Sequence, residues 1–181
     1  IGPKSRPALF PAKADKLAYY INAYNAFTMF NVINRIPGIK SVIDDKTNFF
    51  YFTKFPIDGG EISLFKLENE LIRPVFKEPR IHFALNCASV GCPQLPAVPF
   101  LPKTLEAQLA AETTKFIHEK RNVAIDSTGI ALSQIFKWYK VDFPPNAVAW
   151  IAKKAADIKF PANGEVRYSP YDWALNAQKT E

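Results

Sequence analysis

The segment from Ala14 to Asn34 places the strongest constraint on the fold, because it is apolar on two helical faces at once. With 3.6 residues per turn, one face holds Leu17, Tyr20, Ile21, Tyr24 and Phe27, and another holds Tyr19, Ala23, Ala26, Phe30 and Ile33. A helix that is apolar most of the way round is typical of the centre of a protein. We therefore expect a long, buried N-terminal helix, which Pro37 and Gly38 end.

Shorter elements follow this helix in an irregular order. Strand patterns cover residues 49–57 and 81–86, a turn at 58–60 follows the first of them, and a hairpin joins 123–125 to 130–132. Helices are expected from Ser63 to about Arg73, at 104–121, from Ser133 to Tyr139, and at 145–157. This order favours an α+β fold, with the N-terminal helix packed on a small, mostly antiparallel sheet. The length of 181 residues predicts one domain over 1–181.

Composition excludes several classes of protein. Apolar residues make up 48% and charged residues 22%, as in ordinary globular chains, and no apolar run reaches the roughly 20 residues of an integral membrane segment. The net charge is +6, but the basic residues are dispersed, so we expect a solvated basic surface and no nucleic-acid partner. The chain begins at Ile1 and its single methionine is Met29, so we expect a processed or truncated product that lacks the N-terminal part of its parent.

The two cysteines lie in a stretch of small residues and prolines that follows the predicted strand 81–86. Cys87 and Cys92 are five residues apart, which is compatible with a short disulfide loop, a thiol site or two inert cysteines. A cysteine at the end of a strand, in a turn with free N–H groups, is a common arrangement for a nucleophile. Cys87 is therefore the candidate nucleophile, and the turn that follows it is a candidate oxyanion hole.

Neither of the two histidines is an obvious base for this cysteine. His82 lies five residues before Cys87, about 16 Å away if the stretch is extended at about 3.3 Å per residue, so the two would meet only if the chain folds sharply. His118 points away from the apolar face of its predicted helix and should be solvated.

A carboxylate offers another partner for the thiol. Glu68 falls within the apolar stripe of Leu64, Leu67 and Leu71, where a carboxylate has to be paired, hydrogen-bonded or protonated. Such a group is a candidate for acid–base work, or else a buried structural glutamate. Asn22 and Asn25 lie on the long helix, and buried amides of this kind either brace the core or orient a site.

The sequence indicates no cofactor. His82, Cys87 and Cys92 do not have the spacing of known zinc sites and lack a fourth ligand, and the seven glycines form neither a phosphate loop nor a dinucleotide fingerprint.

Several motifs together resemble a family catalogued only as domain of unknown function 547. They are YYINAYNAF, GGEISLFKLENELIRP, RIHFALNCASVGCPQL, LSQIFKWYKVDF and YDWALN, and they occur in the expected order over most of the chain. The resemblance implies an α+β domain similar to papain-like thiol enzymes, in proteins that are often exported by bacteria. A periplasmic or secreted location is therefore expected.

Position by position, the resemblance matches Cys87 to the prominent cysteine of the family and Glu68 to its glutamate. Asn22 and Asn25 match its asparagine pair, and Asp172 and Asn176 match its C-terminal motif. Many relatives read Ile-Glu-His where this chain has Leu67-Glu68-Asn69. This departure favours Glu68 with an asparagine, rather than a histidine, as the support for Cys87.

These observations lead to one leading hypothesis and two alternatives. The leading hypothesis is a thiol-dependent hydrolase or acyl transferase that acts on a peptide or a small thiol compound. Its catalytic residues would be Cys87, Glu68, Asn22 and Asn25, and its binding residues would be His82, Asn86, Ser89, Asp172 and Asn176. The alternatives are a non-catalytic protein- or ligand-binding module, with Cys87 buried or bonded to Cys92, and a thiol–disulfide protein, although the spacing is unlike a redox Cys-x-x-Cys motif.

Overall fold

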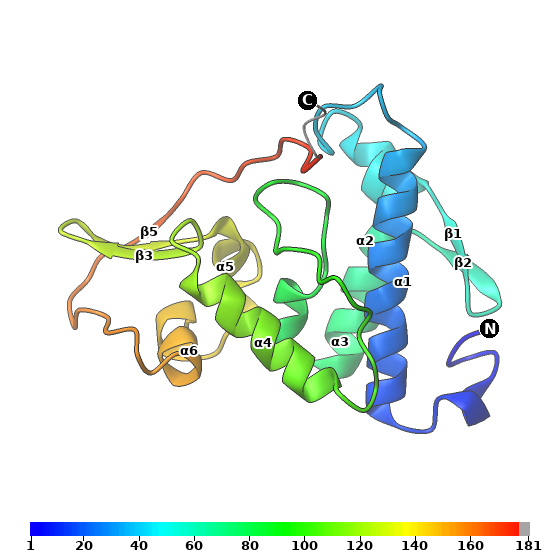
Figure 1. The fold of residues 1–181 in the computed structure, drawn as a ribbon, viewed down its shortest axis with the longest axis horizontal. Helices are drawn as coiled ribbons and strands as arrows, with labels where there is room; N and C mark the ends of the chain where they lie inside the picture. Colours follow the sequence, from blue (N-terminus) through cyan, green and yellow to red (C-terminus); the bar gives the residue numbers. More distant parts are fainter. Residues whose placement is uncertain (178–181) are drawn as a thin grey trace.

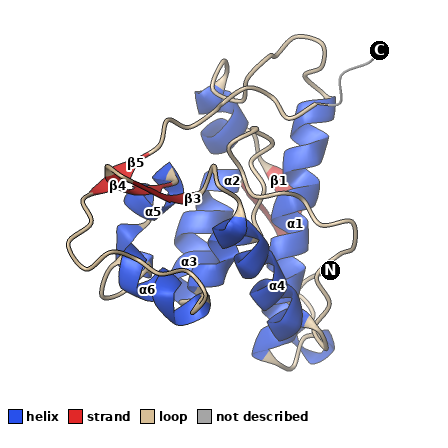
Figure 2. Cartoon of the chain, turned by 60° about the vertical axis from the view of Figure 1, so that its left-hand side comes forward, coloured by secondary structure: helices blue, strands red, loops and turns tan. Residues whose placement is uncertain are grey.

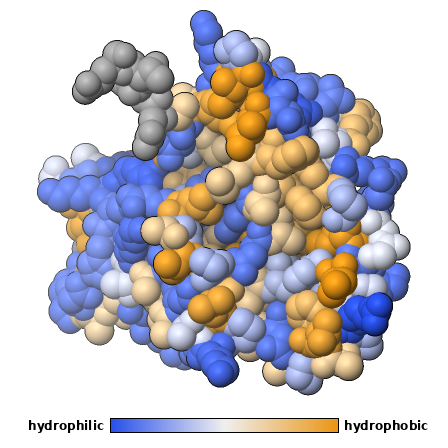
Figure 3. All heavy atoms as spheres, turned by 45° about the vertical axis from the view of Figure 1, so that its right-hand side comes forward, coloured by the Kyte–Doolittle hydropathy of each residue, from blue (hydrophilic) through white to orange (hydrophobic). Residues whose placement is uncertain are grey.

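The long N-terminal helix, α1, extends over Lys13–Ile33 along one side of the molecule (Figure 1). The computed structural model describes residues 1–177. One face of α1 is buried, through Leu17, Ile21 and Tyr24 among others. Phe30 and Ile33, on the other apolar face, are 59% and 65% exposed, so the expectation of burial all round is wrong for this face. Apolar side chains accordingly appear in patches among polar ones on the surface in Figure 3.

The main partner of α1 is a helical segment made of three parts. It comprises α2 (Leu64–Lys66), a π-helical turn at Leu67–Ile72 and α3 (Arg73–Phe76). The hydroxyl of Ser63 caps its start by accepting from the backbone N–H of Lys66. The segment does not end at Arg73 as the sequence suggested, because Pro74 lies in the first turn of α3, where its missing N–H is tolerated.

The predicted strand at 49–57 is a strand only in its last part. Thr47–Phe52 forms a second π-helical turn, and β1 covers Phe55–Ile57. β1 pairs antiparallel with β2 (Gly60–Ile62), and the turn between them has positive φ angles at Asp58 and Gly59. α1 reaches this hairpin where Phe27 stacks on Phe55 with ring centroids 4.7 Å apart.

The second half of the chain forms a three-stranded sheet with helices beside it (Figure 2). β3 (Val123–Asp126) pairs antiparallel with β4 (Gly129–Leu132), and β4 pairs parallel with β5 (Val166–Tyr168). The helices are α4 (Leu105–His118), α5 (Gln134–Trp138) and α6 (Ala147–Lys154). The α+β class is thus confirmed, and both hairpins and every predicted helix are present, with shifted ends. His118 is exposed, as predicted.

Residues 81–85 join two hydrophobic cores. Ile81 and Leu85 belong to the core around α1, while the ring of Phe83 stacks on Phe116 at 4.6 Å in the core around the three-stranded sheet. The prediction of a strand here is wrong, because Pro79–Phe83 forms a 3-10 helix. All five residues from 81 to 85 are buried, so the stretch has no solvent face of the kind that an alternating strand pattern implies.

The C-terminal segment crosses from β5 toward the C-terminal end of α1 (Figure 1). The backbone N–H of Leu175 donates to the carbonyl of Lys40, and the Ser41 hydroxyl donates to the carbonyl of Trp173. On its other side, the same segment accepts hydrogen bonds from residues 87–92, the cysteine turn, at the carbonyls of Asp172 and Ala174. Residues 172–175 therefore fasten the cysteine turn to the loop after α1.

Within residues 1–177, no helix is both long enough and apolar enough to cross a lipid bilayer.

Candidate functional site

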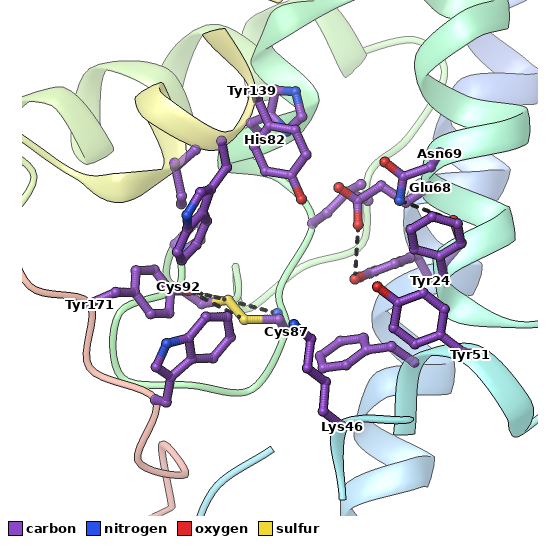
Figure 4. A pocket seen from close by; sticks show the side chains of 17 residues that line it. Tyr24, Lys46, Tyr51, Glu68, Asn69, His82, Cys87, Cys92, Tyr139 and Tyr171 are labelled. Atoms are coloured by element: carbon purple, nitrogen blue, oxygen red, sulfur yellow. Dashed lines mark hydrogen bonds between the residues drawn. A yellow bond between two sulfur atoms is a disulfide. The ribbon is translucent and has the colours of Figure 1, made fainter. Parts of the chain in front are cut away.

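A cavity of about 380 Å³ lies between the two cores, and both the cysteines and Glu68 line it (Figure 4). Its walls also include rings from several segments: Tyr24 of α1, Phe50 and Tyr51 of the π-helical turn Thr47–Phe52, Phe65 of α2, Trp138 of α5, and Tyr139, Tyr171 and Trp173. Lys46, Asn69 and His82 add polar groups. A cavity of this size, mostly apolar with a few polar groups, is typical of small-ligand sites.

The cysteines form a disulfide with an S–S distance of 2.08 Å. This selects the first of the states that their spacing left open. Cys92 is buried and Cys87 is half-buried. The Cys87 sulfur lies 2.8 Å from the Ser89 hydroxyl oxygen and 3.4 Å from that of Tyr171, so predicted binding residue Ser89 does lie beside it. Burial raises the pKa of Tyr171 to about 12, which keeps its hydroxyl neutral at physiological pH.

The backbone beside Cys87 is in an unusual conformation. Ala88 has a φ of 68°, in the left-handed region that residues with a Cβ seldom adopt. Such residues cost about 1–3 kcal/mol each and cluster at functional sites. The cysteine turn thus has one property expected of an active-site turn.

The turn that follows Cys87, the candidate oxyanion hole of the sequence, uses most of its N–H groups in its own hydrogen bonds. The N–H of Ala88 donates to the Asn86 side chain, and those of Val90, Gly91 and Cys92 donate to backbone carbonyls. The short turn folds onto the C-terminal segment, so these four N–H groups already have acceptors. The N–H of Cys87 itself donates to the Cys92 sulfur at 2.9 Å.

Asn25 and Asn86 fix the backbone around Cys87 by hydrogen bonds. The side-chain oxygen of Asn25 accepts from the backbone N–H of Asn86 at 2.8 Å, and its amide donates to the carbonyl of Ala84 at 2.9 Å. Asn86 in turn donates to the carbonyl of Pro93 at 2.6 Å. Asn25 and Asn86 therefore position the residues on either side of Cys87 without lining the cavity.

Asn22 does not belong to this arrangement. Both ends of its side chain bond to the backbone of Phe100, with distances of 2.8 and 2.9 Å. It braces the loop before α4, which is the structural role that the sequence left open for a buried amide.

Glu68 lies on the π-helical turn 67–72, on the opposite side of the cavity from Cys87 in Figure 4. Single π-helical turns often occur at functional sites. The Tyr24 hydroxyl donates to the Glu68 carboxylate at 3.3 Å, and the Tyr139 hydroxyl lies beside the same group. Burial, together with the Glu68 charge, raises the pKa of both tyrosines, so both stay neutral donors. Among the described residues, no hydrogen bond joins Glu68 to Cys87.

His82 lines the same cavity, but its side chain is already hydrogen-bonded to another residue. The chain does fold sharply before Cys87, as a contact with His82 would need, yet the His82 Nε2 bonds to the Asp142 carboxylate at 2.7 Å. Arg73 donates to the same oxygen at 2.8 Å. Burial alone would raise the pKa of Asp142, but the bonds from His82 and Arg73 outweigh it and lower that pKa to about 2. The Tyr139 ring stacks on His82 with centroids 3.9 Å apart.

The C-terminal motif contributes mainly backbone. Asp172 accepts from Gly91 through its carbonyl, and its carboxylate caps the N–H of Ala174. Asn176 donates its backbone N–H to the carbonyl of Ala88. Neither side chain lines the cavity. The binding roles predicted for these two residues stay predictions, and their structural part is to hold the cysteine turn.

Sequence reasoning missed the aromatic wall of the cavity. Trp138 is the last residue of α5 and Tyr139 follows it, whereas Tyr171 and Trp173 lie far along the chain. Trp138 stacks on Trp173 with ring centroids 5.4 Å apart. The motifs LSQIFKWYKVDF and YDWALN could have indicated this wall, because both contain aromatic residues and both end in loops. In the part of the chain that the structure describes, no group of three or more His, Cys, Asp or Glu side chains is placed to hold a metal ion.

One comparison with known proteins adds to this geometry. A family model described as "Protein of unknown function, DUF547" matches residues 10–117, which is more than half of the chain. The chain belongs to the DUF547 family. The match includes Asn25, Glu68 and both cysteines, whereas the Trp138–Tyr139 wall and the C-terminal segment lie beyond it. Neither a curated protein nor a solved structure matches this DUF547 chain.

Proposed function

We propose that this DUF547 chain is a thiol-dependent hydrolase or acyl transferase that acts on a peptide or a small thiol compound, with Cys87 as its nucleophile. The observation that carries the proposal is that the Cys87 sulfur and the Glu68 carboxylate line one cavity large enough for such a ligand. The left-handed Ala88 and the two asparagines that hold the turn give further support, because they fix the position of the sulfur.

The disulfide makes reduction the first step. A dithiol reductant gives two electrons and two protons to the Cys87–Cys92 bond, and two thiols and an oxidised reductant result. Departure of the Cys92 sulfur also frees the Cys87 N–H, which now donates to it. One reductive step would thus release both the nucleophile and a donor for a developing oxyanion.

The chemistry then follows a covalent route. The Cys87 thiol first loses its proton to solvent, and the resulting thiolate adds to the carbonyl carbon of the substrate. The bond from that carbon to the leaving amine or thiol then breaks, and the leaving group takes up a proton from solvent. A thioester remains on Cys87, which water or an acceptor amine or thiol cleaves. Asn25 is a positioning residue in this scheme, and Glu68 acts on the substrate from across the cavity, as a polarising carboxylate or as a base.

The disulfide also supports the exported, periplasmic location that the family resemblance implies. Disulfides persist in oxidising compartments and are rare in the cytosol. In such a compartment the protein would rest in its bridged form and would need a reducing partner for activity.

Paired cysteine variants test the proposal. Cys92→Ala leaves Cys87 unable to form the internal bridge, so purified Cys92→Ala should form an acetyl-enzyme with p-nitrophenyl acetate without reductant. Wild type should do so only after treatment with a phosphine reductant, and Cys87→Ala should do so in neither condition. The adduct is measured by intact mass and its site by peptide mapping.

The disulfide favours one competing function, a non-catalytic binding module in which the bridge is purely structural. In that case Cys87 of the Cys92→Ala protein would alkylate like an ordinary thiol, with a rate that rises only near pH 8.5, and no acetyl-enzyme would accumulate. That pair of results would overturn the enzymatic proposal and leave the binding function.

A further inference from the structure

The walls of the cavity consist mainly of aromatic rings on two opposite sides. On one side Tyr51 stacks on Phe65 with ring centroids 4.6 Å apart. On the other side Tyr171 packs against Trp173 at 4.5 Å, and Trp138 lies against both. The faces of such rings carry negative electrostatic potential and attract cations that lie within about 6 Å.

Glu68 adds an acidic side chain to this aromatic cavity. It is half-buried, and within residues 1–177 no lysine, arginine or histidine forms a salt bridge with it. Its contacts are instead the neutral hydroxyls of Tyr24 and Tyr139. A half-buried carboxylate without a cationic partner, among rings that themselves attract cations, favours the binding of a positively charged group.

Other ionisable groups of the cavity do not supply that charge. His82 is bonded to Asp142, and Arg73, which lies over the Tyr139 ring at 4.8 Å, is bonded to Asp142 as well. Lys46 lies on the disulfide side of the cavity in Figure 4, away from Glu68. The cavity is therefore polarised, with a negative end at Glu68 and a positive group near Cys87.

We infer that the cavity binds a ligand with a cationic amino group, which is held by Glu68 between the aromatic walls. The polarisation also sets the direction of the ligand, with its ammonium at Glu68 and its neutral or anionic end toward Lys46 and the cysteines. As a statement about substrate this rests on the proposed function, and it then selects acyl compounds with a free amino group, such as a peptide with an unblocked N-terminus.

Binding of benzylammonium to the bridged protein tests the inference without any thiol chemistry. Trp138 and Trp173 line the cavity, so their fluorescence should change on binding, whereas Trp150 is buried in the other core and gives a constant background. Benzyl alcohol is the neutral probe of nearly the same shape. We expect benzylammonium to bind at least ten-fold more tightly than benzyl alcohol.

Variants assign the effect to Glu68. Glu68→Gln should weaken benzylammonium about ten-fold or more and leave benzyl alcohol unchanged, because hydrogen bonds to charged groups are stronger than neutral ones. Glu70→Gln is the matched control, since Glu70 lies on the same turn, is exposed and pairs with Lys66 outside the cavity. Lys46→Gln, at an exposed position, should tighten benzylammonium several-fold by removing a like charge.

Two results would overturn the inference: equal binding of both probes, or equal losses from Glu68→Gln and Glu70→Gln. If Glu68→Gln does not fold, the effect of Lys46→Gln on benzylammonium binding and the comparison of the two probes still test the inference. These binding results are independent of the acylation test, because they use the oxidised protein. If Cys92→Ala forms an acetyl-enzyme but the wild-type protein does not prefer benzylammonium, only the amine selectivity is refuted. If the protein prefers benzylammonium but Cys92→Ala forms no acetyl-enzyme, only the enzymatic function is refuted.

Discussion

Replacement of Asp142 by asparagine tests how much the half-buried, hydrogen-bonded cluster of Asp142, His82 and Arg73 stabilises the fold. The Asp142 carboxylate accepts from His82, whose side chain is only 2% exposed, and from Arg73. Asp142→Asn keeps the shape and one acceptor but removes the negative charge, so His82 and Arg73 both lose a charged acceptor. The drop in the pKa of Asp142 from 3.8 to about 2 corresponds to about 2 kcal/mol, since each pKa unit is worth about 1.4 kcal/mol.

The sign of the pH dependence follows from the direction of that drop. A carboxyl whose folded-state pKa is lowered contributes its stability above the unfolded pKa of 3.8 and loses it as the pH falls toward about 2. At pH 7 we therefore expect Asp142→Asn to lose about 2 kcal/mol of unfolding free energy, or about 4–8 °C in melting temperature for a chain of this size. The difference from wild type should shrink as the pH falls from about 5 toward 2.

Urea denaturation of both proteins at a series of pH values measures this difference. Asp157→Asn is the control, because Asp157 bonds to the other histidine, His118, at an exposed position where solvent screens the pair, and it should change the midpoint little. A loss for Asp142→Asn that stays constant from pH 7 to pH 3 would refute the electrostatic explanation and point to packing instead.

Two further substitutions test local features of the backbone. Asn25→Ala should cost about 1–3 kcal/mol, because it leaves a buried carbonyl and an N–H of the cysteine turn without partners, and amide hydrogen exchange should speed up in that turn while α6 is unchanged. Gly129→Ala should lower the thermal midpoint, because Gly129 has a φ of 123° and an added Cβ would overlap the carbonyl oxygen of Glu165. A midpoint at or above that of wild type would show that the β4–β5 pairing yields at this position.

Helices were predicted well because their signals are local. The 3.6-residue periodicity of α1 and α4, and the serine caps before α2 and α5, are properties of adjacent residues. The same patterns did not tell which apolar face of α1 would be covered. Phe30 and Ile33 are as apolar as the buried Ile21, and only the arrangement of other segments separates them.

The errors in the strand predictions, at 81–86 and in the first part of 49–57, arise from tertiary packing. Residues 81–85 alternate in size and polarity, but they pass between two cores and are buried on all sides, so alternation carries no information there. Residues 47–52 are rich in aromatic residues, which favour strands in general, yet they form a π-helical turn that buries Phe49 and leaves Phe52 exposed. In both places tertiary packing decided against the local preference.

For the site, the sequence predicted that Cys87 and Glu68 belong together, and they do line one cavity. It could not decide the state of the cysteines, because a five-residue separation suits a bridge and free thiols alike. It also missed Tyr139 and Trp173, since an aromatic residue far along the chain is more often part of a core than of a cavity wall. Their place follows from the path of residues 171–176, which no local pattern encodes.

The path of residues 171–176 determines where the protein can be truncated for experiments. A fragment trimmed to the region that the family model matches would stop at residue 117, within α4. It would retain both sulfur atoms and Glu68 but would strip Phe83 of most of its neighbours and remove Trp138, Tyr171 and their side of the cavity. The smallest fragment worth expressing therefore extends to at least Asn176, nearly sixty residues past the last residue that the family model matches.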